Sequence, residues 1–140
     1  MKKFTVARTL LLLGFVVGLM SWMFTIGHVG DPKYVLVPEF ELGASHAWYH
    51  AFREAAGDLA AMFTILVIFF GPKNLRVPAT WIICLALMLG YYSPFWIGMP
   101  FMPELSAPNM AAETIHIVMA TLAVAGLLIG RSEFYAESET

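Results

Sequence analysis

The sequence predicts an all-α integral membrane protein: a single domain, residues 1–140, in which four transmembrane helices form an antiparallel bundle. Two observations predict this class. Of the 140 residues, 59% are hydrophobic and 13% are charged, whereas soluble domains are about a quarter charged and a small soluble fold has no interior for so much apolar surface. The apolar residues also gather into four runs, each near the roughly 20 residues that cross a bilayer core, without the alternation of barrel strands.

The four runs predict helices at 9–28, 45–70, 78–97 and 108–130, with outer loops at 29–44 and 98–107. The first run must be distinguished from a signal peptide, because Lys2, Lys3 and Arg8 precede it. It is long for a signal sequence, however, and no Ala-x-Ala cleavage site follows it. We therefore expect it to be retained as a transmembrane helix.

The sequence also contains residues that are typical of helix boundaries and of close helix contacts. Pro72 and Pro78 bracket a short turn between the second and third helices, and Ser106 is the predicted N-cap of the fourth. In the first helix, Gly14 and Gly18 form a GxxxG pair. Such small residues let two helices approach closely, and we expect this pair to pack inside the bundle rather than against a second copy.

The basic residues predict the orientation, because cytoplasmic loops carry an excess of Lys and Arg. Six basic residues lie on the side that also holds both termini: Lys2, Lys3, Arg8, Lys73, Arg76 and Arg131. The loops of the opposite side carry only Lys33. We therefore expect both termini in the cytoplasm, and the chain in the inner or plasma membrane of a bacterium.

Ionisable side chains inside the predicted membrane segments carry the functional signal, because such groups are costly in lipid. They are His28 on the first helix, His46, His50, Arg53, Glu54 and Asp58 on the second, and Glu113 and His116 on the fourth. At about 100° and 1.5 Å per residue, His50 and Glu54 share one face of their helix, as Glu113 and His116 do of theirs. The two pairs lie at similar depth, so they would converge if the two helices were neighbours.

The leading hypothesis is a protein that binds a transition metal or a metal-containing cofactor. Its ligands would be His50, Glu54, Glu113 and His116, with His46 and His28 at the periphery and Asp58 at the floor. Two imidazoles and two carboxylates suit iron, zinc or manganese, and methionines on the same side would favour copper. The Glu113-x-x-His116 spacing occurs in carboxylate-bridged dimetal bundles, although this chain has one copy of it. Alternatively, His50 and His116 would be the axial ligands of a haem-type tetrapyrrole.

A second hypothesis is a metal-free membrane isomerase or cyclase acting on a lipid-like or terpenoid substrate. Glu54, Asp58 and Glu113 would be its acid and base groups, since a carboxylic acid in apolar surroundings can keep its proton at neutral pH. A paired histidine would remove a proton elsewhere. Aromatic rings would line the cavity and stabilise a cation: Trp48, Tyr91, Tyr92 and Trp96.

A third hypothesis is an accessory subunit of a larger membrane complex, in which the ionisable groups serve packing alone. The partners on these hypotheses are membrane lipid, a hydrophobic small molecule or larger subunits. The net charge of −2 gives no electrostatic case for nucleic acid. Neither Cys84 nor Ser21 lies in a motif for nucleophilic catalysis.

Overall fold

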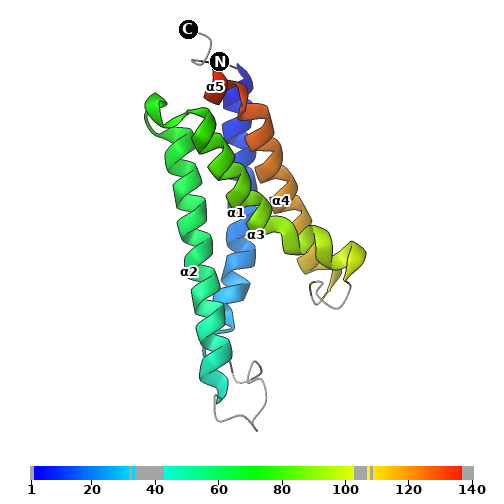
Figure 1. The fold of residues 1–140 in the computed structure, drawn as a ribbon. Helices are drawn as coiled ribbons and strands as arrows, with labels where there is room; N and C mark the ends of the chain where they lie inside the picture. The colour runs from blue at the N-terminus through cyan, green and yellow to red at the C-terminus, as the bar shows by residue number, and fades with distance from the viewer. Residues whose placement is uncertain (1, 32, 34–42, 103–106, 108, 137–140) are drawn as a thin grey trace.

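The computed structural model describes residues 2–31, 33, 43–102, 107 and 109–136, with the backbone alone at 43–46 and 98–99. Its elements are α1 (Lys2–Gly27), α2 (Gly43–Phe70), the short 3-10 turn η2 (Lys73–Leu75), α3 (Pro78–Phe101), α4 (Met110–Gly130) and α5 (Ser132–Tyr135). The described chain is thus all-helical, as predicted, with four long helices (Figure 1). Three helical segments are long and apolar enough to cross a membrane: Lys2–Gly27, Pro78–Ile97 and Met110–Tyr135.

α1 begins seven residues before the predicted start because its first two turns are packed against the rest of the chain. Phe4 and Ala7 are buried. The Arg8 Nε donates a hydrogen bond to the Phe69 carbonyl oxygen at 2.9 Å, and the guanidinium lies 4.4 Å from the Phe4 ring centroid. These contacts hold the basic N-terminal segment in helical form beyond the apolar run that predicts the helix.

The boundaries around the second predicted outer loop also differ from expectation. α3 continues to Phe101 through Pro94 and Pro100, so the first four residues of the predicted loop are helical. The N-cap of α4 is Asn109, whose side chain accepts a hydrogen bond from the Ala112 N–H at 3.0 Å. Ser106, the predicted cap, lies outside the described residues.

α1 and α4 form the most closely packed helix pair because glycines bring their backbones together. A Cβ atom on Gly14 would lie 2.7 Å from the Ala123 nitrogen, and one on Gly126 would lie 2.7 Å from the Ala7 carbonyl oxygen. The expectation that Gly14 packs inside the bundle is therefore confirmed. Around these contacts lies the core, which includes Leu11, Phe15, Met119, Ala120 and Leu127.

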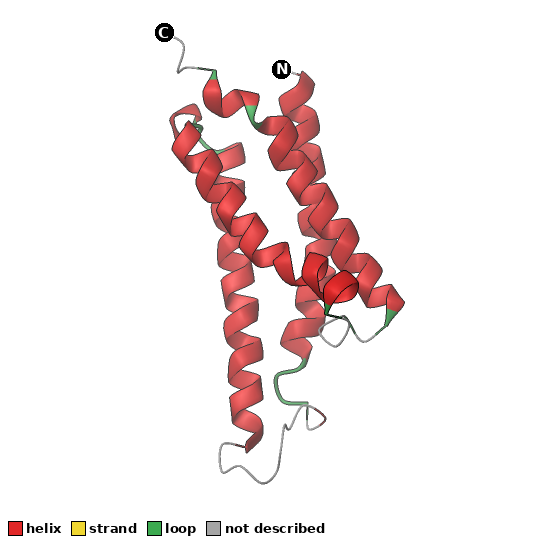
Figure 2. Cartoon of the chain, turned by 45° about the vertical axis from the view of Figure 1, so that its right-hand side comes forward, coloured by secondary structure: helices red, strands yellow, loops and turns green. Residues whose placement is uncertain are grey.

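α2 stands at the edge of the molecule (Figures 1 and 2). In the described part of the chain it packs on α1, touches α3 at few points and makes almost no contact with α4. One face of α2 is buried, and its buried residues are Ala51, Ala55, Asp58, Met62, Ile65, Ile68 and Phe69. The two helices that carry most of the predicted site residues are therefore not packed together.

Candidate functional site

The structure divides the predicted site residues between two places. Glu113 and His116 lie on α4, which packs against α1, whereas His50, Glu54 and Asp58 lie on α2. The expected convergence of the α2 and α4 residues is not found among the described residues. In that part of the chain, no three His, Cys, Asp or Glu side chains gather closely enough to hold a metal ion. The side chain of His46, a peripheral candidate, lies outside the described residues.

A groove of about 420 Å³ lies between α1 and α4, at the end of this helix pair away from Lys2 and Tyr135. Its polar lining residues are Ser21, Thr25, His28, Asn109 and His116, and its apolar ones are Phe24, Ala111, Ala112 and Ile115. Small-molecule sites usually enclose roughly 300–1,000 Å³ and combine apolar walls with a few polar groups. The groove meets both criteria, and it contains two of the predicted histidines.

His116 is held in a defined orientation on the wall of this groove. Its Nε2 lies 3.0 Å from the Ser21 hydroxyl oxygen, and its ring stacks on Phe95 with 4.3 Å between the centroids and 16° between the planes. Side chains from α1 and α3 thus fix the imidazole from two sides. Its other nitrogen, Nδ1, is buried and has no hydrogen-bond partner within the described residues.

Glu113 lies one helical turn before His116 and is 4% exposed. Its Oε2 accepts a hydrogen bond from the Ala107 N–H at 2.9 Å. Its Oε1 is buried, with no hydrogen bond from any described residue. A carboxylate in the first turn of a helix is favoured by the helix dipole, but a buried polar atom without a partner is costly. Glu113 and His116, which share a face of α4, thus each keep one unused hydrogen-bonding atom.

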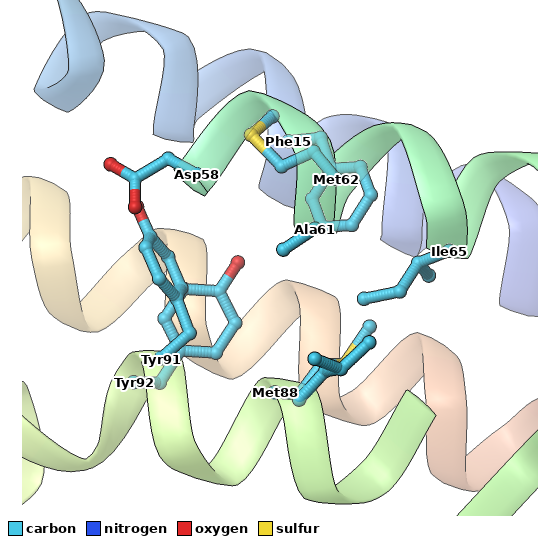
Figure 3. Close-up of a pocket in the computed structure, with 9 residues that line it drawn as sticks. Phe15, Asp58, Ala61, Met62, Ile65, Met88, Tyr91 and Tyr92 are labelled. Atoms are coloured by element: carbon cyan, nitrogen blue, oxygen red, sulfur yellow. The ribbon is translucent and has the colours of Figure 1, made fainter. Parts of the chain in front are cut away.

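Asp58 forms a second polar centre, between α2 and α3 (Figure 3). It is buried and makes a side-chain hydrogen bond with Tyr91, and Tyr92 lies beside it. The enclosed space is about 10 Å³, which is room for about one water molecule. Tyr91 and Tyr92 are two of the four aromatic residues expected to line a site, whereas Trp48 and Trp96 do not line this pocket. This centre therefore links two helices and leaves no room for a substrate.

The remaining candidates on α2 are exposed. The Nδ1 of His50 lies 3.3 Å from a guanidinium nitrogen of Arg53, and that guanidinium lies 5.5 Å from the Tyr49 ring centroid. Glu54 is also exposed. The axial-pair hypothesis needs His50 and His116 to face each other. In the described structure they do not, because α2 and α4 are not packed together.

Ser21 and Thr25 are polar groove residues that the sequence does not single out, because no catalytic motif surrounds them. A signal is nevertheless present. Ser21, Thr25 and His28 recur at intervals of four and three residues, which places them on one face of a helix. A polar stripe at the end of an otherwise apolar helix indicates a wall of a site rather than a lipid-facing surface.

Comparisons with protein-family models, with curated proteins and with solved structures find no match to this chain.

Proposed function

We propose that this chain is a membrane enzyme that moves a proton on a neutral, lipid-like substrate bound in the α1–α4 groove. The observation that supports this most directly is the Ser21–His116 pair on the wall of the groove, one turn from the buried carboxyl group of Glu113. Histidine is the commonest general acid and base in enzymes. The metal-free isomerase hypothesis is thus the one that the groove favours.

The proposal places all four long helices across the bilayer as an antiparallel bundle, with both termini in the cytoplasm. Three helical segments have the length and apolar composition for this, and α2 exposes large apolar side chains along its length, among them Phe52 at 59% and Phe63 at 68%. Six of the eight basic residues lie near the chain termini and η2. The groove then faces the outer half of the bilayer, where a lipid-like molecule can enter sideways.

The lining of the groove indicates the class of substrate. None of the described residues that line the groove is a Lys or an Arg, and a carboxylate at Glu113 would repel an anion. The hydroxyl groups of Ser21 and Thr25 and the amide of Asn109 provide hydrogen bonds for one polar end. The apolar side chains of Phe24 and Ile115 accommodate a hydrocarbon part. The substrate is therefore a neutral amphiphile with a hydroxyl or carbonyl group at one end.

The proposed reaction is a 1,3-proton shift by a single base. The Nδ1 of His116, which is the imidazole nitrogen that Ser21 does not hold, removes a proton from a carbon beside a double bond or carbonyl group, and the electron pair moves along the conjugated atoms. The resulting imidazolium exchanges this proton with water and then donates a proton at the far end of that system, so atoms and charge balance and one solvent hydrogen enters the product. Ser21 holds the imidazole through its hydrogen bond. Glu113, when ionised, stabilises the imidazolium as a neighbouring negative charge.

The experiment follows the proton in deuterium oxide. Membranes that contain the protein are incubated in deuterium oxide, and their extracted lipids are analysed by mass spectrometry for a neutral lipid that gains one deuterium. His116→Gln should lower this incorporation by about 100-fold, the scale of a lost general base. His50→Gln is the matched control, because His50 is exposed on α2. Equal incorporation in the wild type and in folded His116→Gln would contradict the proposal.

A further inference from the structure

The face of α2 opposite its buried face forms a narrow row, which we call the α2 seam. It comprises Arg53, Gly57, Ala60, Thr64 and Val67, all of which are exposed. Their spacing of four, three, four and three residues keeps them in line along a helix and is the spacing of a two-helix interface. α2 stands at the edge of the molecule (Figure 1), and the seam lies on its exposed side, opposite the buried residues.

The middle of the seam is shaped to receive another helix. A Cβ atom on Gly57 would meet no atom within 4 Å, and Ala60 and Thr64 are also small. The Thr64 hydroxyl already bonds to the Ala60 carbonyl oxygen at 2.8 Å, so it presents its methyl group without an unpaired donor. Phe52 and Phe63 protrude beside these small residues. Small residues at a membrane helix surface let a second backbone approach closely.

The charges at one end of the seam identify the occupant. Arg53 and Glu54 are adjacent, exposed and of opposite sign. At 1.5 Å per residue they lie about 26 Å and about 24 Å along α2 from Phe70, within the roughly 30 Å core of a bilayer. Arg53 contacts His50 and Tyr49 of its own helix, but lipid offers neither Arg53 nor Glu54 a group of opposite charge, which is costly. Two identical helices side by side bring each Arg53 level with the other chain's Glu54.

We propose that a second copy of this chain docks on the α2 seam, about a twofold axis parallel to the helices. Copies inserted in the same direction have their seams at equal depth, so small residues face small residues and the two Arg53–Glu54 pairs form together. Such a self-complementary patch is what a twofold interface requires. The inference depends on the membrane placement of the chain and not on the proposed proton transfer.

The first test is cysteine cross-linking in lipid vesicles. Cys84, the single cysteine, is buried and is first replaced by Ala. Ala60→Cys is then compared with Leu89→Cys, which lies at similar depth on an exposed part of α3. Mild oxidation should give a disulfide-linked dimer for Ala60→Cys and little for Leu89→Cys. Equal yields overturn the proposal, as does the absence of a dimer for both Ala60→Cys and Gly57→Cys.

A second test measures the dimer fraction by single-molecule photobleaching in diluted vesicles. Ala60→Leu should weaken dimerisation at least about tenfold, whereas Ala86→Leu, on an exposed part of α3, should have no effect. Arg53→Glu alone should weaken the dimer, and the exchanged pair Arg53→Glu with Glu54→Arg should restore it. A monomer at every dilution, or cross-linking of Ala60→Cys in cell membranes to a different protein, would overturn the second-copy proposal.

Discussion

The α1–α4 pair and α2 are both largely apolar helical regions, yet the chain holds them in different ways. α1 and α4 are in backbone contact at Gly14 and Gly126. α2 is tied to its neighbours by single side chains: Trp22 donates to the Ala55 carbonyl oxygen at 2.8 Å, and Tyr91 bonds to Asp58. Polar side chains on the tightly held pair are fixed in a groove, whereas many of those on α2 are exposed. Close backbone packing, more than the presence of ionisable residues, distinguishes the candidate site.

The largest expected effect breaks the α1–α4 contact itself. Gly14→Ala places a methyl group where backbone atoms of α4 already lie, and overpacking of this kind costs about 2 kcal/mol of the free energy of unfolding. Gly90→Ala is the control, because its Cβ atom would meet no atom within 4 Å and alanine is the better helix former. Unfolding in a detergent series should show a loss for the first variant and a small gain for the second.

Equal stability of the two glycine variants would contradict the description of α1 and α4 as a backbone-packed pair. The groove lies between the same two helices, so Gly14→Ala should also reduce the proposed proton exchange. Gly90→Ala should leave the exchange unchanged.

The next effect concerns the hydrogen bond that orients His116. Ser21→Ala removes the hydroxyl that lies 3.0 Å from Nε2. Without this hydrogen bond the imidazole is less well oriented, which should raise the activation free energy by about 1.4 kcal/mol and lower deuterium incorporation about tenfold. Glu54→Gln changes an exposed carboxylate on α2 and should have no effect on incorporation. Ser21→Thr keeps the hydroxyl and should retain more activity than Ser21→Ala. Identical activity of Ser21→Ala and the wild type would show that the pair serves packing alone.

The sequence predicts the helices well because apolar runs of membrane length are a local property of the chain. Residues 45–70 and 78–97, for example, are helical over the whole of their predicted extent. The longer α1 depends on Arg8, whose partner Phe69 lies 61 residues away. The added turn of α3 passes through Pro100, a residue that usually marks the end of a helix. Neither extension follows from a local pattern.

The candidate site could be predicted in part. Helical spacing places Glu113 and His116 on one face of α4, and the structure finds both at or beside the groove. The same spacing places His50 and Glu54 together, but it contains no information about which helix faces them. That choice depends on glycine contacts between α1 and α4, and it brings Ser21 rather than His50 to His116. Helical spacing therefore predicts which residues share a face of a helix and at what depth they lie, but not which other helix packs against that face.

A smaller effect measures how firmly α2 is attached. Asp58→Leu leaves the half-buried Tyr91 hydroxyl without its partner, and Tyr91→Phe leaves the buried Asp58 carboxyl group without its own. Because each single variant strands a polar group, the double variant should be more stable than the sum of the single losses predicts. The expected coupling is about 1 kcal/mol, measured by unfolding of all four proteins in detergent. Purely additive losses would mean that the hydrogen bond does not join α2 to α3.

The smallest expected effect is on metal content. Its measurement tests directly whether the α1–α4 groove and α2 form separate regions. If His116 acts as a base, the purified protein should contain well below one iron, copper, zinc or manganese per chain by elemental analysis. The content should be the same after His50→Gln and after His116→Gln. Near-stoichiometric metal that is lost in both variants would instead require α2 and α4 to meet, against the separation seen between them. Metal lost only in His116→Gln would place a metal site in the α1–α4 groove, with a further ligand outside the described residues. The groove would then still be the functional site, but the proton-shift mechanism would be wrong.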